Sequence, residues 1–89
     1  MKVTYETTCS AVCPVDENVI DMYGVTIVTD GFFLTVEEIN EQIRELTQSP
    51  VFQESLTQML HDTLAVDDDG IIEVTLKGFH SGVTVTATA

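Results

Sequence analysis

The sequence predicts a single α+β domain over residues 1–89, in which two helices lie on one face of an antiparallel, four-stranded sheet. Apolar and polar residues alternate in one segment near the N-terminus and in two near the C-terminus, as they do in half-buried strands, and a second N-terminal segment is rich in β-branched residues. Between these pairs, apolar residues recur at helical spacing in two successive segments. The expected order is therefore ββααββ, with no helix between the strands of either pair.

The N-terminal pair of strands is expected to be joined by a long loop. Residues 3–8 read as the first strand because apolar and polar side chains alternate along them. Residues 9–18 are expected to form the loop, since they contain Pro14 and a polar run. Residues 19–29 are expected to form the second strand, which is richest in β-branched residues near its end and is closed by the Asp-Gly pair at 30–31.

Two helices are expected between the strand pairs. Thr35 and Glu38 form a capping-box pair that begins the first helix. Ser49 and Pro50 are expected to begin the second, as its cap and its first helical residue, and the acidic run with glycine at 67–70 is expected to end it. The apolar residues of the first helix are Val36, Ile39, Ile43 and Leu46. Those of the second are Phe52, Leu56, Met59, Leu60 and Leu64.

The C-terminal strands are expected over residues 72–77 and 83–87, on either side of a tight glycine-containing segment at 78–82. A sheet of four such strands has two exposed edges, which proteins usually cover or pair. A chain of this length also buries only about 60% of the surface that its unfolded form exposes. We therefore expect a homo-oligomer in which several sheets close into a barrel.

The charge of the chain excludes several classes of partner. Three Lys and Arg residues stand against 15 Asp and Glu residues, which gives a net charge of −12. Nucleic-acid binding requires cations that displace phosphate counterions, so no nucleic-acid partner is expected. An anionic membrane is disfavoured for the same reason. The acidic surface is expected to maintain solubility.

A cytoplasmic location is expected from the N-terminal segment and the cysteines. The residues after Lys2 are polar, unlike a signal peptide, and no run approaches the roughly 18 apolar residues of a membrane span. Cys9 and Cys13 are spaced C-x3-C, which is neither a redox C-x-x-C pair nor a disulfide framework. Both thiols are therefore expected to be reduced.

The ββααββ order resembles the tunnelling fold. The resemblance implies that protomers join sheet to sheet into a barrel and that barrels stack in pairs. It also implies active sites between protomers, where a glutamate on the second helix binds the edge of a purine or pterin. Three segments of the chain carry this resemblance more specifically.

The first segment is residues 49–57, which read SPVFQESLT. It is similar to the P-x-x-Q-E-x-L-T opening of the second helix in GTP cyclohydrolase I. It also resembles the F-H-E of the nitrile reductase that acts on 7-cyano-7-deazaguanine, with Gln53 where that enzyme has histidine. The resemblance implies that Glu54 holds the heterocycle, with Gln53 beside it, through two parallel N–H bonds to the carboxylate. From the residues alone, Glu54 is a first-turn glutamate favoured by the helix dipole.

The second segment is residues 10–15, which read SAVCPV and are followed by Asp21. It resembles the S-x-C-P-V segment of the nitrile reductase, which implies that Cys13 attacks the nitrile to give a thioimide and that Asp21 transfers the proton. The spacing departs by one residue from the family pattern, which leaves Asp16 as a competing candidate. Without the resemblance, Cys13 is a small buried residue at a strand end.

The third segment is residues 71–80, which can be aligned with the strand of GTP cyclohydrolase I that ends in an active-site histidine. On that alignment His80 transfers protons, whereas the residues alone also fit a solvated loop histidine. Cys9, Cys13 and His80 could together supply a three-ligand zinc site. Zinc is nevertheless not expected, because the C-x-x-H pair and the later cysteine of GTP cyclohydrolase I are missing here.

These matches favour an enzyme that processes the nitrile of 7-cyano-7-deazaguanine by reduction or by amidine formation. NADPH is doubtful as its cofactor, because the lysine-rich nicotinamide-binding segment of the reductase is replaced by residues 31–34, which carry no cation. The chain resembles the related archaeal amidinotransferase better. The alternatives are a GTP cyclohydrolase-like enzyme, a non-catalytic purine- or pterin-binding module, and a purely structural protein.

Overall fold

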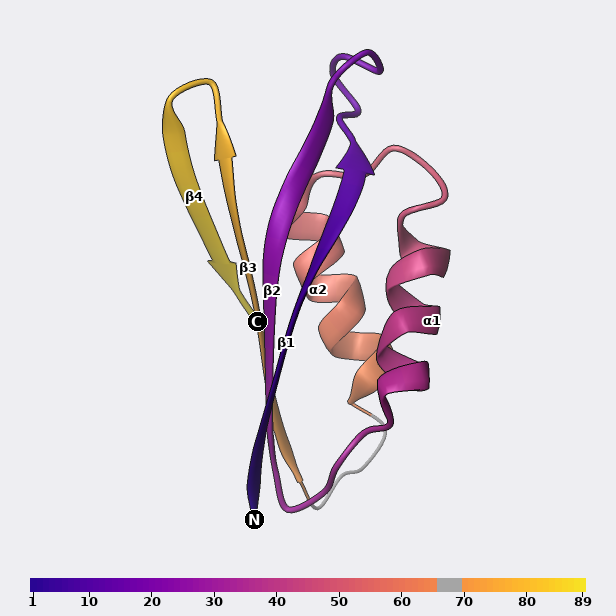
Figure 1. Cartoon of the computed structure of the whole chain (residues 1–89), viewed down its shortest axis with the longest axis vertical. Helices are drawn as coiled ribbons and strands as arrows, with labels where there is room; N and C mark the ends of the chain where they lie inside the picture. Colours follow the sequence, from indigo (N-terminus) through magenta and orange to yellow (C-terminus); the bar gives the residue numbers. More distant parts are fainter. Residues whose placement is uncertain (66–69) are drawn as a thin grey trace.

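A computed structural model describes residues 1–65 and 70–89 of the chain. The elements are β1 (Lys2–Val12), β2 (Ile20–Asp30), α1 (Val36–Leu46), α2 (Gln53–Leu64), β3 (Ile71–His80) and β4 (Val83–Thr88). This order confirms the predicted ββααββ arrangement. Figure 1 shows both helices on the same face of one sheet. The acidic residues 67–69, which were expected to end the second helix, lie outside the described residues.

The four strands form one antiparallel sheet in the order β1-β2-β3-β4. The β1–β2 pairing runs to Val12↔Ile20, and the β3–β4 pairing runs to His80↔Val83. The β2–β3 pairing, however, stops at Tyr23↔Gly78. The two hairpins therefore separate beyond this pair, as Figure 1 shows near the top of the view. This separation positions the candidate site.

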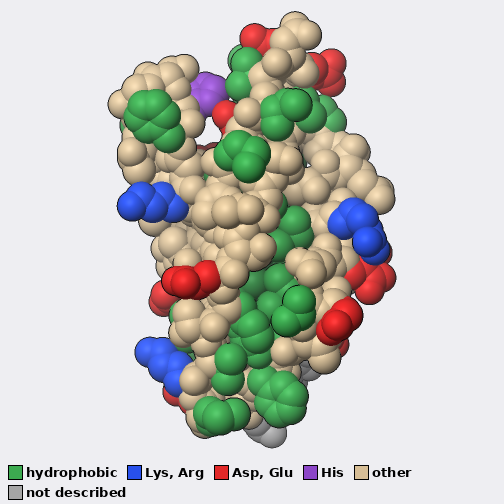
Figure 2. All heavy atoms as spheres, viewed as in Figure 1, with side chains coloured by type: hydrophobic (Ala, Val, Ile, Leu, Met, Phe, Trp, Pro, Cys, Tyr) green, Lys and Arg blue, Asp and Glu red, His purple; other side chains and the backbone are tan. Residues whose placement is uncertain are grey.

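The core lies between the sheet and the helices. Alternate residues of β2 and β3 face the helices, which is the period-two pattern predicted for half-buried strands. The largest fully buried apolar side chains are Val25, Ile27, Leu56, Leu60, Val74 and Leu76. Burial of each such side chain contributes about 1.5–3 kcal/mol. On the face drawn in Figure 2, hydrophobic side chains reach the surface along the middle of the molecule, and charged ones lie mostly toward the rim.

Two strand boundaries differ from the prediction. Residues 9–12 belong to β1 rather than to a loop, because they continue the pairing with β2 from Cys9↔Tyr23 onward. Residues 78–80 belong to β3 rather than to a tight turn, because they pair with β4. The turn itself is Ser81-Gly82, with φ values of 49° and 84°. Two successive residues with positive φ are what a two-residue hairpin requires, and the turn places His80 at its base.

The start of α1 was predicted correctly, whereas the start of α2 was not. The capping box of Thr35 and Glu38 is present, with hydrogen bonds of 2.8 and 3.1 Å. The predicted cap at Ser49 is wrong: α2 begins at Gln53, and its N-cap Phe52 makes no side-chain cap bond. The start is displaced because Val51 is tied to β1, where its N–H donates to the carbonyl of Val12 at 3.1 Å.

The apolar faces of the helices are narrower than predicted. Leu56, Leu60 and Leu64 are buried as expected, and Ile39 is the buried residue of α1. The side chains that are exposed instead are Val36, Phe52 and Met59, at 61, 49 and 37% of their surface. No helix in the part of the chain that the structure describes is long and apolar enough to cross a membrane.

Candidate functional site

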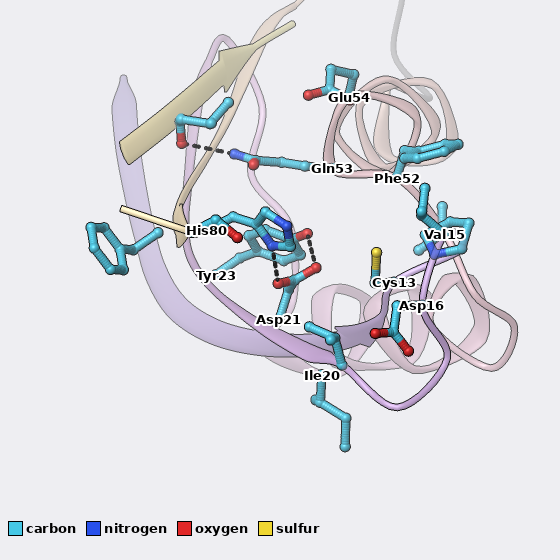
Figure 3. A pocket seen from close by; sticks show the side chains of 16 residues that line it. Cys13, Val15, Asp16, Ile20, Asp21, Tyr23, Phe52, Gln53, Glu54 and His80 are labelled. Atoms are coloured by element: carbon cyan, nitrogen blue, oxygen red, sulfur yellow. Dashed lines mark hydrogen bonds and ion pairs between the residues drawn. The ribbon is translucent and has the colours of Figure 1, made fainter. Parts of the chain in front are cut away.

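A pocket of about 670 Å³ lies where the two hairpins separate. It is lined by the loop after β1, by the start of β2, by residues 51–54 around the start of α2, by the end of β3 with the turn after it, and by Val85 of β4. All six residues singled out from the sequence as catalytic or ligand-binding candidates line it: Cys13, Asp16, Asp21, Gln53, Glu54 and His80. Figure 3 shows these side chains around the pocket.

Cys13 is held at the pocket by a compact loop between β1 and β2. Its backbone N–H donates to the carbonyl of Val19 at 3.0 Å, and the N–H of Val19 donates to the carbonyl of Asp16 at 2.9 Å. The Asp16 carboxylate in turn accepts a hydrogen bond of 3.0 Å from the backbone N–H of Asn18. Asp16 therefore stabilises the loop turn. The Asp16 carboxylate is thus bonded within its own loop, whereas Asp21 lies in β2. Cys13 itself is nearly buried, with 9% of its surface exposed.

Asp21 and His80 form a close pair across the opening between the hairpins. The Nδ1 atom of His80 lies 3.0 Å from Oδ1 of Asp21, with the two side chains 52 and 13% exposed. The pair spans the strand ends at the point where backbone pairing between β2 and β3 has ceased. The sequence placed both residues in the site but did not predict that they touch.

Tyr23 is a pocket residue that sequence analysis missed. Its hydroxyl lies 3.5 Å from Oδ2 of Asp21, and the residue is 6% exposed. Burial, and after it the negative charge of Asp21, raises the pKa of Tyr23 to about 12. The hydroxyl therefore stays protonated and donates toward Asp21. The available signal was its position two residues after Asp21, on the same face of a strand.

Gln53 and Glu54 lie together at the start of α2 but differ in burial. Gln53 is buried, and its Nε2 atom donates to the carbonyls of Leu76 at 2.8 Å and Val85 at 2.9 Å. These bonds fix the orientation of the amide, so a ligand can meet only its Oε1 atom, an acceptor. Glu54 is exposed and lines the pocket with a carboxylate.

Several apolar side chains at the pocket are exposed to solvent. They are Val15, Ile20, Phe52 and Phe79, which are between 49 and 81% exposed. Phe52 was expected in the core, yet its place next to Gln53 puts its ring at the pocket. A flat apolar ligand or another subunit would bury these side chains favourably.

The charge of the pocket bears on the expected cofactors. Asp16, Asp21 and Glu54 line it, and neither Lys nor Arg is among the lining residues. The phosphates of NADPH have no cation to meet here, so this cofactor does not fit the residues of the pocket. Within residues 1–65 and 70–89, no group of three or more His, Cys, Asp or Glu side chains, Cys9, Cys13 and His80 included, is arranged to hold a metal ion.

The chain folds as a four-stranded antiparallel sheet with two helices in ββααββ order, and its candidate site lies where the two hairpins separate. Among solved structures, it is similar to an archaeosine synthase described as QueF-Like, in the apo form, with a TM-score of 0.86 and 23% sequence identity. The match covers 99% of this chain and 90% of that one, which establishes the shared fold. No protein-family model matches the chain, and no curated protein matches it.

Proposed function

We propose that the protein is an enzyme that binds 7-cyano-7-deazaguanine in this pocket and attacks the nitrile carbon with Cys13. The observation that carries the proposal is the convergence of Cys13, Asp21, Glu54 and His80, from four separate segments, on one pocket. The shared fold with an archaeosine synthase supports the same substrate class.

The groups at the start of α2 suit the edge of a deazaguanine ring. The carboxylate of Glu54 can accept two parallel N–H bonds from a guanine-like edge, which are stronger than neutral hydrogen bonds. The Oε1 atom of Gln53 adds a further acceptor, because its Nε2 atom is already bonded to the sheet. The exposed ring of Phe52 offers an apolar surface against which a planar ligand can pack. The site therefore complements a flat ligand that presents several N–H donors.

The chemistry begins with addition of the Cys13 thiol to the nitrile. A bond forms between sulfur and the nitrile carbon, one π bond of the C≡N group breaks, and the nitrogen takes up a proton to give a thioimide. The Asp21–His80 pair is the proton-handling group of the site. Ammonia can then displace the Cys13 thiol and give an amidine. This outcome needs no anionic cofactor and is favoured over reduction by a pocket without cationic side chains.

The mass of the intact protein tests this proposal. After incubation with 7-cyano-7-deazaguanine, the wild type should gain the mass of one ligand, since addition releases no leaving group. Cys13→Ala should show no gain. Cys9→Ala is the matched control and should react normally, because Cys9 does not line the pocket. An unchanged wild-type mass would remove the mechanism.

A non-catalytic binding module is the second candidate function. It is favoured by the burial of Cys13, which is only 9% exposed. Titration with guanine, pterin and 7-deazaguanine ligands separates the two candidates. Saturable binding without a covalent adduct, retained in Cys13→Ala and lost in Glu54→Gln, would establish the module instead of the enzyme.

We further propose that the protein acts as a homo-oligomer. β1 and β4 are the outer strands of the sheet, so each leaves one side without a strand partner in the described chain. Pairing β1 of one copy with β4 of the next would satisfy both edges and close a barrel. The exposed apolar residues at the pocket would then be covered by a neighbouring copy, and the site would lie at the subunit boundary.

A further inference from the structure

Three polar side chains of the site are linked in a row by hydrogen bonds. The row runs from Tyr23 through Asp21 to His80, with separations of 3.5 and 3.0 Å. All three residues line the pocket, and Figure 3 shows Cys13 in the same pocket. The proposed mechanism requires one of these groups to supply a proton to the nitrile nitrogen.

Asp21 is poorly suited to donate that proton. Its Oδ1 atom accepts from Nδ1 of His80 and its Oδ2 atom faces the hydroxyl of Tyr23, so both oxygens already have a donor. The contacts of Asp21 instead fix its orientation and, through it, the orientation of the imidazole.

His80 is better suited to transfer the proton, because only one of its two ring nitrogens contacts Asp21. With its Nδ1–H donated to Asp21, the neutral imidazole presents an unprotonated Nε2 atom that can accept a proton. A carboxylate that holds one ring nitrogen in this way fixes the tautomer and stabilises the imidazolium that forms when the other nitrogen is protonated. His80 is 52% exposed at the side chain, so this second nitrogen is accessible to a bound ligand.

Tyr23 holds Asp21 in place through its hydroxyl, which faces the carboxylate oxygen that His80 does not contact. Its ring occupies the space beside Gly78, where a Cβ atom would come within 2.6 Å of Cδ1. The absence of a side chain at position 78 therefore lets the ring lie at the last backbone pair between β2 and β3, with its hydroxyl directed at Asp21. The raised pKa of Tyr23 keeps this hydroxyl a donor through the physiological range.

We infer that His80 takes the proton of the Cys13 thiol on Nε2 and delivers it to the nitrile nitrogen, while Asp21 and Tyr23 act as positioning residues. The step balances without another reagent. The thiol loses one proton, the sulfur–carbon bond forms, one C≡N π bond breaks, and the nitrogen receives that proton. This inference rests on the proposed nitrile chemistry and deepens it, since it assigns proton transfer to the histidine instead of the aspartate.

The test follows the rate of adduct formation by mass spectrometry in four variants. His80→Gln and Asp21→Asn should each slow formation by about 100-fold, the lower range for the loss of general acid–base catalysis. Tyr23→Phe should slow it by about three- to tenfold. His61→Gln is the matched control and should react like the wild type, because His61 makes the same 3.0 Å contact with an aspartate, Asp62, outside the pocket.

A nitrogen-15 NMR spectrum reports which ring nitrogen of His80 carries the proton. This tautomer should change only if Asp21 positions the ring, and not if Asp21 merely stabilises the fold. The wild type should show His80 protonated on Nδ1. In Asp21→Leu, which leaves the Nδ1–H of His80 without its acceptor, the preference for the Nδ1 tautomer should be lost. Tyr23→Phe should preserve the Nδ1 tautomer and broaden its signal.

The outcomes separate this inference from the proposed function. A reactive wild type together with a His80→Gln variant that reacts equally fast would overturn the inference and leave the Cys13 chemistry intact. A wild-type protein that forms no adduct would overturn both. A folded Asp21→Leu variant with an unchanged His80 tautomer would show that Asp21 does not position the ring.

Discussion

The ring of Tyr23 lies against the backbone of Gly78, so closely that a Cβ atom at position 78 would sit 2.6 Å from Cδ1 and 2.7 Å from Cε1. We predict that Gly78→Ala lowers the free energy of unfolding by about 1–3 kcal/mol, because the ring must move out of a packed position. Urea denaturation measures this change.

Gly24→Ala is the control for this substitution. Gly24 lies in β2, and a Cβ atom there would meet only the carbonyl oxygen of Lys77, at 3.8 Å. We expect it to leave stability unchanged or to raise it by about 0.5 kcal/mol, as alanine loses less conformational freedom than glycine on folding. Equal effects of the two substitutions would show that Tyr23 is not held by Gly78.

Gln53 fastens α2 to two strands through one nitrogen atom. Gln53→Leu leaves the carbonyls of Leu76 and Val85 without this donor. We expect a loss of about 2–4 kcal/mol, since each buried unsatisfied group costs about 1–3 kcal/mol. Gln58→Leu, which removes an exposed 3.0 Å bond to Asp62, should change stability by less than about 0.5 kcal/mol. Comparable losses would contradict the buried role of Gln53.

The pKa of Tyr23, raised to about 12, predicts a dependence of stability on pH. A tyrosine has a pKa near 10 when unfolded, so the folded state favours the protonated form. The resulting stabilisation is complete below pH 10 and is lost as the pH rises toward 12, by about 2 kcal/mol. The stability difference between wild type and Tyr23→Phe, measured by urea denaturation, should therefore shrink over this window. A constant difference would contradict the shift.

The outward edge of β4 predicts how the protein assembles. Val74 and Ala89 exchange N–H···O bonds of 2.9 and 2.8 Å, and the alternation of an antiparallel ladder then directs the N–H of Thr86 away from β3. Thr86→Pro should therefore keep the β3–β4 ladder but block pairing with another copy. Light scattering should show an oligomer for wild type and Thr86→Ala, and a smaller species for Thr86→Pro. A monomeric wild type would exclude the barrel.

Local patterns in the sequence predicted most of the fold. The capping box at Thr35 and the alternation along β3 depend on neighbouring residues, and both are present. The start of α2 was misplaced because it depends on a bond from Val51 to Val12, 39 positions away in the chain. β3 extends past Gly78 because residues 78–80 pair with β4, a contact between strands that no local pattern records.

The sequence pointed to residues that line the pocket but not to the contacts between them. The resemblance to known families pointed to Cys13, Asp21, Gln53, Glu54 and His80, and the structure brings them to one pocket. The pairing of Asp21 with His80 depends on where β2 and β3 part, and this is set by the sheet as a whole. The bonds of Gln53 to the sheet and the place of Tyr23 depend on the same three-dimensional packing.

The most direct test of the central claim is to locate the bound nucleobase on the chain. Fragment-ion mass spectrometry of the wild type after incubation with 7-cyano-7-deazaguanine should place one added ligand on Cys13, with Cys9 unmodified. Loss of the adduct in Glu54→Gln at low ligand concentration, with recovery at high concentration, would agree with recognition through that carboxylate. An adduct on Cys9, or none on either thiol, would contradict the account.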